Sequence, residues 1–232
     1  MNAANPLVVL SDVTKVYGRG TAAIHALAGV DLLIQRGEFV AVMGPSGSGK
    51  STCLNLLGCL DTPSAGDYRF RGVATSRLGR DQRALLRRHF FGFIFQGFNL
   101  LKRTSALENV ELPLLYRGLG RRERRVKALR ALDAVGLGDR GTSTAAELSG
   151  GQQQRVAIAR AIVTEPDLLL ADEPTGNLDS ARSREIMELL RRFNRDFGIT
   201  IVMVTHEPDM AGYAGRQIRF LDGRIEEDRA TG

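Results

Sequence analysis

The sequence predicts an α/β fold from three observations. Short apolar runs bounded by glycine and proline alternate with stretches of helical periodicity, which is typical of alternating strands and helices. Two runs, DLLLAD at 167–172 and TIVMVT at 200–205, are continuously apolar, as in strands covered on both faces. Between residues 98 and 165 helical spacing dominates, which indicates a helical insertion in the α/β core.

Six strands are expected in this core, and the two continuously apolar runs should occupy the middle of the sheet. The last strand should form a hairpin with RIEE, because Asp222 and Gly223 are a frequent tight-turn pair. The expected strands cover residues 7–17, 29–35, 38–44, 167–172, 200–205 and 217–222.

The inserted region carries helical signals of its own. Ser105 and Glu108 have the spacing of a capping box, and Pro113 should kink or end the helix that follows because proline lacks an N–H. A further helix is expected where apolar residues recur at helical spacing, at Val126, Leu129, Leu132 and Val135.

Length and composition favour one domain that is cytosolic and does not itself cross a membrane. The 232 residues are 43 % hydrophobic, which is enough for a core. The N-terminus has no leader pattern, and no stretch reaches the roughly 18 apolar residues of a spanning helix. Cys53 and Cys59 have neither metal-site nor disulfide spacing, so both should be reduced and buried.

Charge gives a weaker indication of partners. The net charge is +6, but the basic residues are spread along the chain, so a solvated surface is favoured and no nucleic-acid partner is expected. The basic stretch GRRERRVK at 120–127 fits an ordinary exposed helix face, or a contact for anionic lipid headgroups or an acidic partner.

A phosphate-binding loop is the most specific motif. Residues 44–52 follow a strand pattern, precede a helical one and match G-x-x-x-x-G-K-[ST]. Glycines let backbone N–H groups converge on phosphates, Lys50 should reach the β- and γ-phosphates, and the Ser51 hydroxyl should bind Mg²⁺. The alternative is a glycine turn with only a structural role, but such a turn does not need a strand before it and a helix after it, and this loop has both. The loop consists of Gly44, Pro45, Ser46, Gly47, Ser48, Gly49, Lys50, Ser51 and Thr52.

Two carboxylates at the end of LLLADE fit the same chemistry. Asp172 is expected to hold Mg²⁺, and Glu173 to face the γ-phosphate as general base or water positioner. Adjacent strand residues point to opposite faces, so the chain has to turn here if both carboxylates line one site. For an isolated pair, helix capping or solvation is the alternative.

A second anion-binding pattern occurs in ELSGGQQQR at residues 147–155. Ser149, Gly150, Gly151 and Gln152 precede the helical run VAIARAIV, and the N–H groups and dipole at such a helix start favour an anion. A simple helix cap is the alternative. One nucleotide does not need two such loops.

Together these motifs resemble the nucleotide-binding subunit of ABC transporters. Five elements occur in that family's order: GPSGSGKST, FIFQ ending at Gln96, LSGGQ, LLLADE, and VTH ending at His206. The resemblance covers nearly all of residues 7–226. GFIFQGFNLL, TSALENVELPLLY and ADEPTGNLD resemble the subfamily of macrolide exporters, lipoprotein-releasing ATPases and the cell-division ATPase.

The resemblance implies a fold and its division. It implies a P-loop NTPase (RecA-like) core with an N-terminal antiparallel β subdomain and an inserted helical subdomain. One ABC ATPase domain would then span residues 1–232. Its α/β catalytic core would cover 1–97 and 166–232, and its helical subdomain, with the signature motif LSGGQ, would cover 98–165.

The resemblance also implies roles for four further residues. Tyr17 is similar to the aromatic that stacks on adenine, a contact that depends little on base identity. Gln96 is similar to the glutamine that touches Mg²⁺ and the attacking water, and His206 to the histidine that contacts the γ-phosphate. Asp179 is similar to an aspartate between subunits, and it can equally cap the helix that starts near Ser180.

The resemblance gives the second loop a purpose. In that family two copies meet head to tail, and each LSGGQ closes on the ATP held by the partner's phosphate loop. The cofactors implied are ATP and Mg²⁺. The partners implied are a second copy of this chain, held by ATP, and an integral membrane permease subunit on a separate chain.

The leading hypothesis is an ATPase that powers export or extraction of a substrate from the membrane. Its expected location is cytoplasmic, peripheral on the inner face of the cytoplasmic membrane through the permease. A regulatory ABC ATPase that signals through a membrane protein to a cell-wall enzyme stays open as an alternative. Soluble ABC ATPases of translation or DNA repair fit less well, because they usually have two nucleotide domains or long coiled-coil insertions. The similar macrolide exporters carry membrane helices on the same chain, so a partner subunit and an excised domain both fit.

Overall fold

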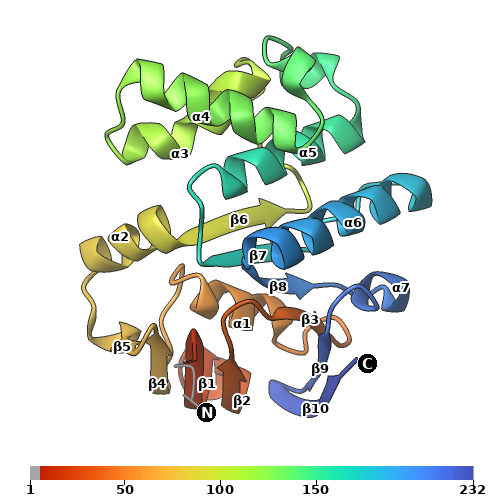
Figure 1. Cartoon of the computed structure of the whole chain (residues 1–232). Helices are drawn as coiled ribbons and strands as arrows, with labels where there is room; N and C mark the ends of the chain where they lie inside the picture. The colour runs from red at the N-terminus through yellow and green to blue at the C-terminus, as the bar shows by residue number, and fades with distance from the viewer. Residues whose placement is uncertain (1–5, 232) are drawn as a thin grey trace, which may run out of the picture.

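The computed structural model describes residues 6–231, in which ten strands and seven α-helices are arranged in layers (Figure 1). The strands are β1 (Val8–Tyr17), β2 (Ile24–Ile34), β3 (Phe39–Met43), β4 (Ala65–Phe70), β5 (Val73–Ala74), β6 (Phe91–Phe95), β7 (Leu168–Asp172), β8 (Thr200–Val204), β9 (Arg216–Leu221) and β10 (Arg224–Ala230). The helices are α1 (Lys50–Leu57), α2 (Arg80–Phe90), α3 (Ala106–Tyr116), α4 (Arg121–Ala134), α5 (Gly150–Ile162), α6 (Ser180–Phe197) and α7 (Pro208–Ala211).

Figure 1 shows an antiparallel sheet at the bottom, called the lower sheet, and a six-stranded sheet, called the middle sheet, which runs from β6 in the middle of the view down to β9 and β10 beside the lower sheet. The lower sheet is antiparallel, with the order β2-β1-β4-β5. The middle sheet has the order β10-β9-β3-β8-β7-β6; β9, β3, β8, β7 and β6 are parallel, and β10 pairs antiparallel with β9. Helices α3, α4 and α5 lie above this sheet. The expected hairpin at Asp222 and Gly223 is confirmed as the turn between β9 and β10.

The continuously apolar runs lie in the middle of the six-stranded sheet because both of its faces are covered. In β8, Ile201 and Met203 belong to the core beneath helices α3 to α6, whereas Val202 and Val204 belong to the core shared with α1 and the antiparallel sheet. β7 divides its leucines between the two cores in the same way. The prediction that both runs are inner strands is therefore confirmed.

The sequence does not predict β4, β5 and β6, and it starts β2 too late. β4 pairs with β1, far away in sequence, and there Tyr68 and Phe70 are buried opposite Leu10 and Val8. Only this long-range pairing distinguishes AGDYRF from a polar loop. β6 is short and has Gly92 as its second residue, which weakens its strand pattern.

The expected capping box at the start of α3 is confirmed. The Ser105 hydroxyl accepts the Glu108 N–H at 3.2 Å, and Glu108 accepts the Ser105 N–H at 2.8 Å. The helix does not end at Pro113 but continues to Tyr116. Proline removes one helical hydrogen bond, and burial of neighbouring side chains such as Leu114 offsets that loss.

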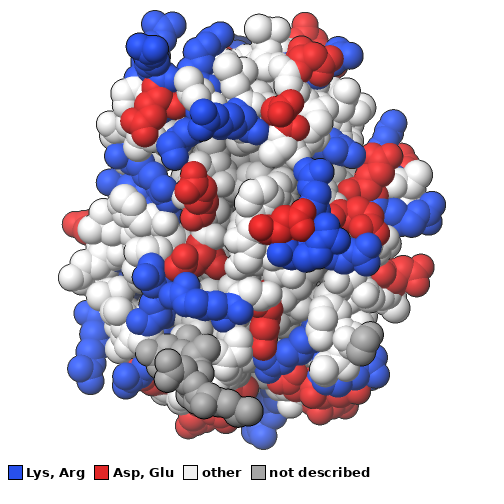
Figure 2. All heavy atoms as spheres, viewed as in Figure 1, with Lys and Arg blue, Asp and Glu red and all other residues white. Residues whose placement is uncertain are grey.

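The surface is charged and mixed. On the face shown in Figure 2, basic and acidic side chains are interspersed. The basic stretch 120–127 forms the start of α4, where Arg121, Arg122 and Arg125 are exposed. Cys53 and Cys59 are free and buried, as expected. Within residues 6–231, no helix is long and apolar enough to cross a bilayer.

Gly92 allows β6 to lie close against α5, the helix that begins at LSGGQ. A Cβ at this position would lie 2.5 Å from the carbonyl oxygen of Ala161 and 2.8 Å from Leu169 Cδ1. Neither the backbone nor the packed leucine has room to move away. The close approach of β6 to α5 therefore requires glycine.

We predict that Gly92→Ala lowers the free energy of unfolding by about 1–3 kcal/mol, because the methyl group overpacks the β6–α5 contact. Urea denaturation measures the change. Gly215→Ala is the control, since its Cβ meets no heavy atom within 4 Å, and it should change stability by less than about 0.5 kcal/mol. Equal stability of the two variants would contradict the packing argument.

Candidate nucleotide-binding and catalytic site

The candidate site lies where four parallel strands end. Phe95, Asp172 and Val204 are register partners across β6, β7 and β8, and Val42 of β3 pairs with Val204. The residues that follow these positions therefore emerge at one edge of the sheet, which is where ligands bind in open α/β sheets. This edge brings together the phosphate loop, Gln96, the Asp172–Glu173 pair and His206.

The phosphate loop connects β3 to α1 with three glycines at positive φ: Gly44, Gly47 and Gly49. A Cβ on Gly44 would lie 2.2 Å from the Phe220 carbonyl oxygen of β9. Gly49 is the N-cap of α1 and provides no side-chain cap. The first N–H groups of α1 are therefore available to an anion.

Lys50 and Ser48 are poised inside this loop. The Lys50 ammonium is buried and donates to the carbonyl oxygens of Gly44 at 2.8 Å and Pro45 at 2.7 Å. The Ser48 hydroxyl is buried and has no hydrogen-bond partner among the described residues. A cation held by neutral carbonyls can transfer to a phosphate, because a charged acceptor forms the stronger bond.

A left-handed residue turns the chain between the two carboxylates. Glu173 has φ of 46°, and its N–H donates to the Val204 carbonyl at 3.0 Å. Burial raises the pKa of Asp172, the Glu173 carboxylate raises it further, and Lys50 lowers it. The turn that both carboxylates require at the strand end is therefore present. The nearby Lys50 does not offset the effects of burial and of Glu173 on the pKa of Asp172.

His206 contacts the same carboxylate. It follows β8 by two residues, and its Nδ1 lies 3.1 Å from Oε1 of Glu173. The imidazole is 61 % exposed, whereas the Glu173 side chain is 27 % exposed. Because the imidazole contacts Glu173 and is largely exposed, it can fix the orientation of that carboxylate, and it can also contact a ligand bound at the strand ends.

The loop after β6 links Gln96 to two other parts of the molecule. Asn177, in the loop after Glu173, donates to the Gln96 carbonyl at 2.8 Å. Arg160 of α5 donates to the carbonyls of Phe98 at 2.8 Å and Asn99 at 2.6 Å, and burial lowers the pKa of this guanidinium. The position of Gln96 is therefore coupled both to the loop that follows Glu173 and to α5.

LSGGQ forms a second cluster with Asp179. The Ser149 hydroxyl accepts the Gln152 N–H at 3.3 Å, and the Gln152 side chain accepts the Ser149 N–H at 2.9 Å. Asp179 caps α6 by accepting the Arg182 N–H at 2.9 Å. The Arg182 side chain lies against Gly151, whose added Cβ would be 3.0 Å from Arg182 Cδ. Both expected caps are thus present.

The two clusters are separate within one chain. Among the described residues, no hydrogen bond or ion pair joins Ser149–Gln152 or Asp179 to the phosphate loop.

Tyr17 lies at the end of β1, 41 % exposed, and its hydroxyl donates to Asp61 at 2.8 Å. No local sequence pattern indicates a role for Asp61, Arg160 or Asn177, because their partners lie far away in sequence.

The expected Mg²⁺ ligands fit that ion in chemistry. Ser51 offers a hydroxyl at the start of α1, and Asp172 is a half-buried carboxylate whose raised pKa an adjacent cation would lower. Mg²⁺ takes one or two carboxylates together with phosphates and water. Within residues 6–231, no three His, Cys, Asp or Glu side chains form a group that could hold a metal ion by themselves.

The sequence matches a family model described as ABC transporter over residues 27–176. An uncharacterized ABC transporter ATP-binding protein of Methanocaldococcus jannaschii is 49 % identical over 221 residues, which cover 95 % of this chain and 98 % of the relative. The chain belongs to the ABC transporter family. The expected fold, family and enzyme class, an ATPase, are thereby confirmed.

Two further similarities place this ABC cassette more closely. The macrolide export ATP-binding/permease protein MacB of Marinobacter nauticus is 54 % identical over 223 residues, or 96 % of this chain and 34 % of that protein. The chain therefore spans about a third of the length of the curated macrolide exporters it matches. The ATP-binding cassette MJ0796, whose dimeric structure in a post-hydrolysis state contains ADP and Pi, is 45 % identical in sequence to this chain. The two structures match with a TM-score of 0.89 over 97 % of this chain and 99 % of MJ0796.

We predict that Gly176→Ala lowers kcat by about tenfold to a hundredfold, because a misplaced catalytic group is costly. The added Cβ would lie 2.6 Å from Nε2 of Gln96 and displace that amide. Steady-state ATPase kinetics measure the effect. Gly97→Ala, next to Gln96 in the loop after β6, is the control, since its Cβ would lie at an ordinary contact distance of 3.5 Å from Oδ1 of Asn99. An unchanged kcat for Gly176→Ala would contradict a role for the position of Gln96.

Proposed function

We propose that two copies of this cassette hydrolyse ATP at two sites that they share head to tail, and that the cycle drives a membrane permease. The separation of the two anion-binding clusters within one chain carries this proposal. A dimer with twofold symmetry repeats each contact, so one interface supplies both sites. The dimeric form of the similar cassette MJ0796 supports this arrangement.

Each proposed site takes parts from both copies. One copy contributes the phosphate loop, Gln96, Asp172, Glu173 and His206. The partner contributes the N–H groups of Gly150 and Gly151 and the Ser149 hydroxyl, at a helix start that favours an anion. Asp179 would lie beside them at the same interface, because Arg182 joins it to Gly151.

The proposed reaction is transfer of the γ-phosphoryl group to water. Lys50 exchanges the carbonyls of Gly44 and Pro45 for the β- and γ-phosphates. Glu173 orients the water and accepts its proton as the new P–O bond forms and the bond to ADP breaks. His206, 3.1 Å from Glu173, holds that carboxylate and contacts the γ-phosphate.

Ser51, Asp172 and Gln96 would hold Mg²⁺ in this proposal. The bound ion neutralises charge that develops on the phosphate oxygens. The contacts of Gln96 with Asn177 and of its loop with Arg160 support a further role. Through these contacts the α3–α5 helices would move when the γ-phosphate binds or leaves. The ATP-bound and ADP-bound states would then differ in their affinity for the closed dimer, and this difference would drive the motion.

The proposed docking site for the permease is a groove of about 570 Å³ between α2, β6, α3 and α5. It begins at Asn99, three residues after Gln96, so a segment docked there senses that loop. Its lining suits a cytoplasmic segment with apolar and acidic side chains. The lining includes aromatic and basic residues: Phe91, Phe93, Phe95, Tyr116, Arg87, Arg88 and Arg160.

The names of the matched macrolide exporters support a permease partner, because each joins ATP-binding and permease parts. Export or extraction of a substrate from the membrane is the transport activity that we propose. The cassette would then lie in the cytoplasm against the membrane, peripheral to its permease.

We predict that Glu173→Gln slows ATP turnover by about 10²- to 10⁴-fold, the usual contribution of a general base. ATP should still hold two chains together, because the phosphate contacts are intact. Steady-state ATPase assays measure turnover, and size-exclusion chromatography with ATP detects the dimer. Lys50→Met is the control, since it should abolish both turnover and the dimer peak.

Two results would contradict this assignment. Turnover by Glu173→Gln near the wild-type rate would remove Glu173 from the reaction. A Glu173→Gln chain that binds ATP but remains monomeric at high ATP concentration would argue against sites shared between copies.

A further inference from the structure

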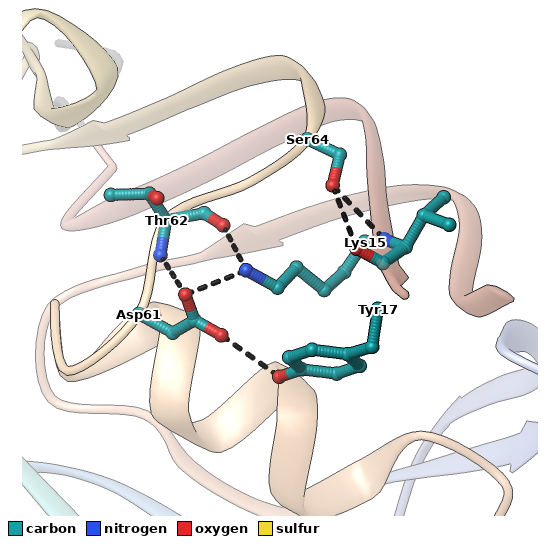
Figure 3. Close-up of polar contacts among 6 residues, drawn as sticks. Lys15, Tyr17, Asp61, Thr62 and Ser64 are labelled. Atoms are coloured by element: carbon teal, nitrogen blue, oxygen red, sulfur yellow. Dashed lines mark hydrogen bonds and ion pairs between the residues drawn. The ribbon is translucent and has the colours of Figure 1, made fainter. Parts of the chain in front are cut away.

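Tyr17 is held by a polar cluster that joins the end of β1 to the segment after α1 (Figure 3). Its hydroxyl donates to Oδ2 of Asp61 at 2.8 Å. The other carboxylate oxygen, Oδ1, accepts from the Lys15 ammonium at 2.6 Å and from the Thr62 N–H at 2.7 Å. Asp61 thus receives three donors, one of which is the phenol that it fixes.

The charge of Asp61 is stabilised in this setting. Burial alone would raise the pKa of Asp61, but the hydrogen bonds from Lys15, Thr62 and Tyr17 lower it overall. Lys15 is 9 % exposed and also donates to the Thr62 carbonyl at 2.9 Å. A buried ammonium paired with an ionised carboxylate gives an anchor with little freedom to move.

Lys15 also restrains the ring itself. Lys15 and Tyr17 are two residues apart on β1. The ammonium lies 4.8 Å from the centroid of the Tyr17 ring, within the range of a cation–π contact. The ring is 41 % exposed, and a base can stack only on a face that the ammonium leaves free.

The cluster links the two ends of one nucleotide site. Helix α1 begins at the phosphate loop, and Asp61 follows its end by four residues. The N–H groups of Leu60 and Asp61 donate to the Asn55 carbonyl of α1, at 2.9 and 3.3 Å. The Ser64 N–H donates to the Thr14 carbonyl of β1 at 2.8 Å. The position of the Tyr17 ring is therefore fixed relative to the helix that binds phosphate.

We propose that Lys15 and Asp61 are positioning residues that hold the Tyr17 ring ready to stack on a purine base. The proposal rests on the proposed function, ATP binding by this chain, and on the role that the family resemblance implies for Tyr17, stacking on the base of ATP. A binding group that is already ordered loses less conformational freedom when its ligand arrives. An ion pair that only stabilises the fold would not distinguish a ligand with a base from one without.

The test compares the Kd of ATP with that of tripolyphosphate, which lacks the base, by calorimetry of the full chain in EDTA. Asp61→Ala should weaken ATP by about threefold to tenfold and leave tripolyphosphate unchanged. Tyr17→Ala should weaken ATP by about fivefold to a hundredfold, and Asp61→Ala should add nothing in that background. Tyr17→Phe, which loses only the hydroxyl bond, should fall between wild type and Tyr17→Ala.

Asp67→Ala is the matched control, because Asp67 pairs with Arg69 at 2.6 Å on β4 and should affect neither ligand. Equal losses for ATP and tripolyphosphate, unchanged ATP affinity, or a remaining Asp61→Ala effect in the Tyr17→Ala background would each overturn the proposal. If Asp61→Ala does not fold, Tyr17→Phe with wild-type ATP affinity overturns it. Failure of the premise that Tyr17 stacks on the base is distinct, since Tyr17→Ala would then bind ATP as tightly as the wild-type chain.

Discussion

The alignment of parallel strand ends is the constraint on which the site depends. β3, β6, β7 and β8 are hydrogen-bonded in a register that brings residues 42, 95, 172 and 204 level with one another. The loops that carry the candidate site residues begin one or two residues beyond these positions, so backbone hydrogen bonds within the sheet fix the spacing of the groups at the strand ends. A one-residue slip would turn these side chains to the opposite face.

Contacts between the loops add coupling to this geometry. The Gln96 loop is held by Asn177 from the loop after β7 and by Arg160 from α5. Gly92 keeps β6 close to that same helix. Lys15 and Asp61 hold Tyr17 to the segment after α1 in a similar way. These contacts connect the phosphate loop's surroundings both to the helices above the sheet and to Tyr17, which is how the proposed cycle would pass from one part to the other.

Local patterns predicted the parts of the site, and long-range contacts determined how the parts are joined. GPSGSGKST and LLLADE gave the loop and carboxylates, because their glycines and apolar strands leave strong local signals. β4 and β6 were missed since their pairing partners lie far away in sequence. The same reason hid Asp61, which meets Tyr17 across 44 residues. A turn was expected at Glu173, but no sequence signal indicated the left-handed backbone conformation of this residue.

The central claim is that each ATP site is shared between two copies of the chain. Mixing two inactive variants, Lys50→Met and Ser149→Arg, tests it directly by ATPase assay. In a mixed head-to-tail dimer one intact phosphate loop faces one intact LSGGQ, so the mixture should hydrolyse ATP although neither variant does so alone. A mixture that stays as inactive as either variant alone would contradict the account.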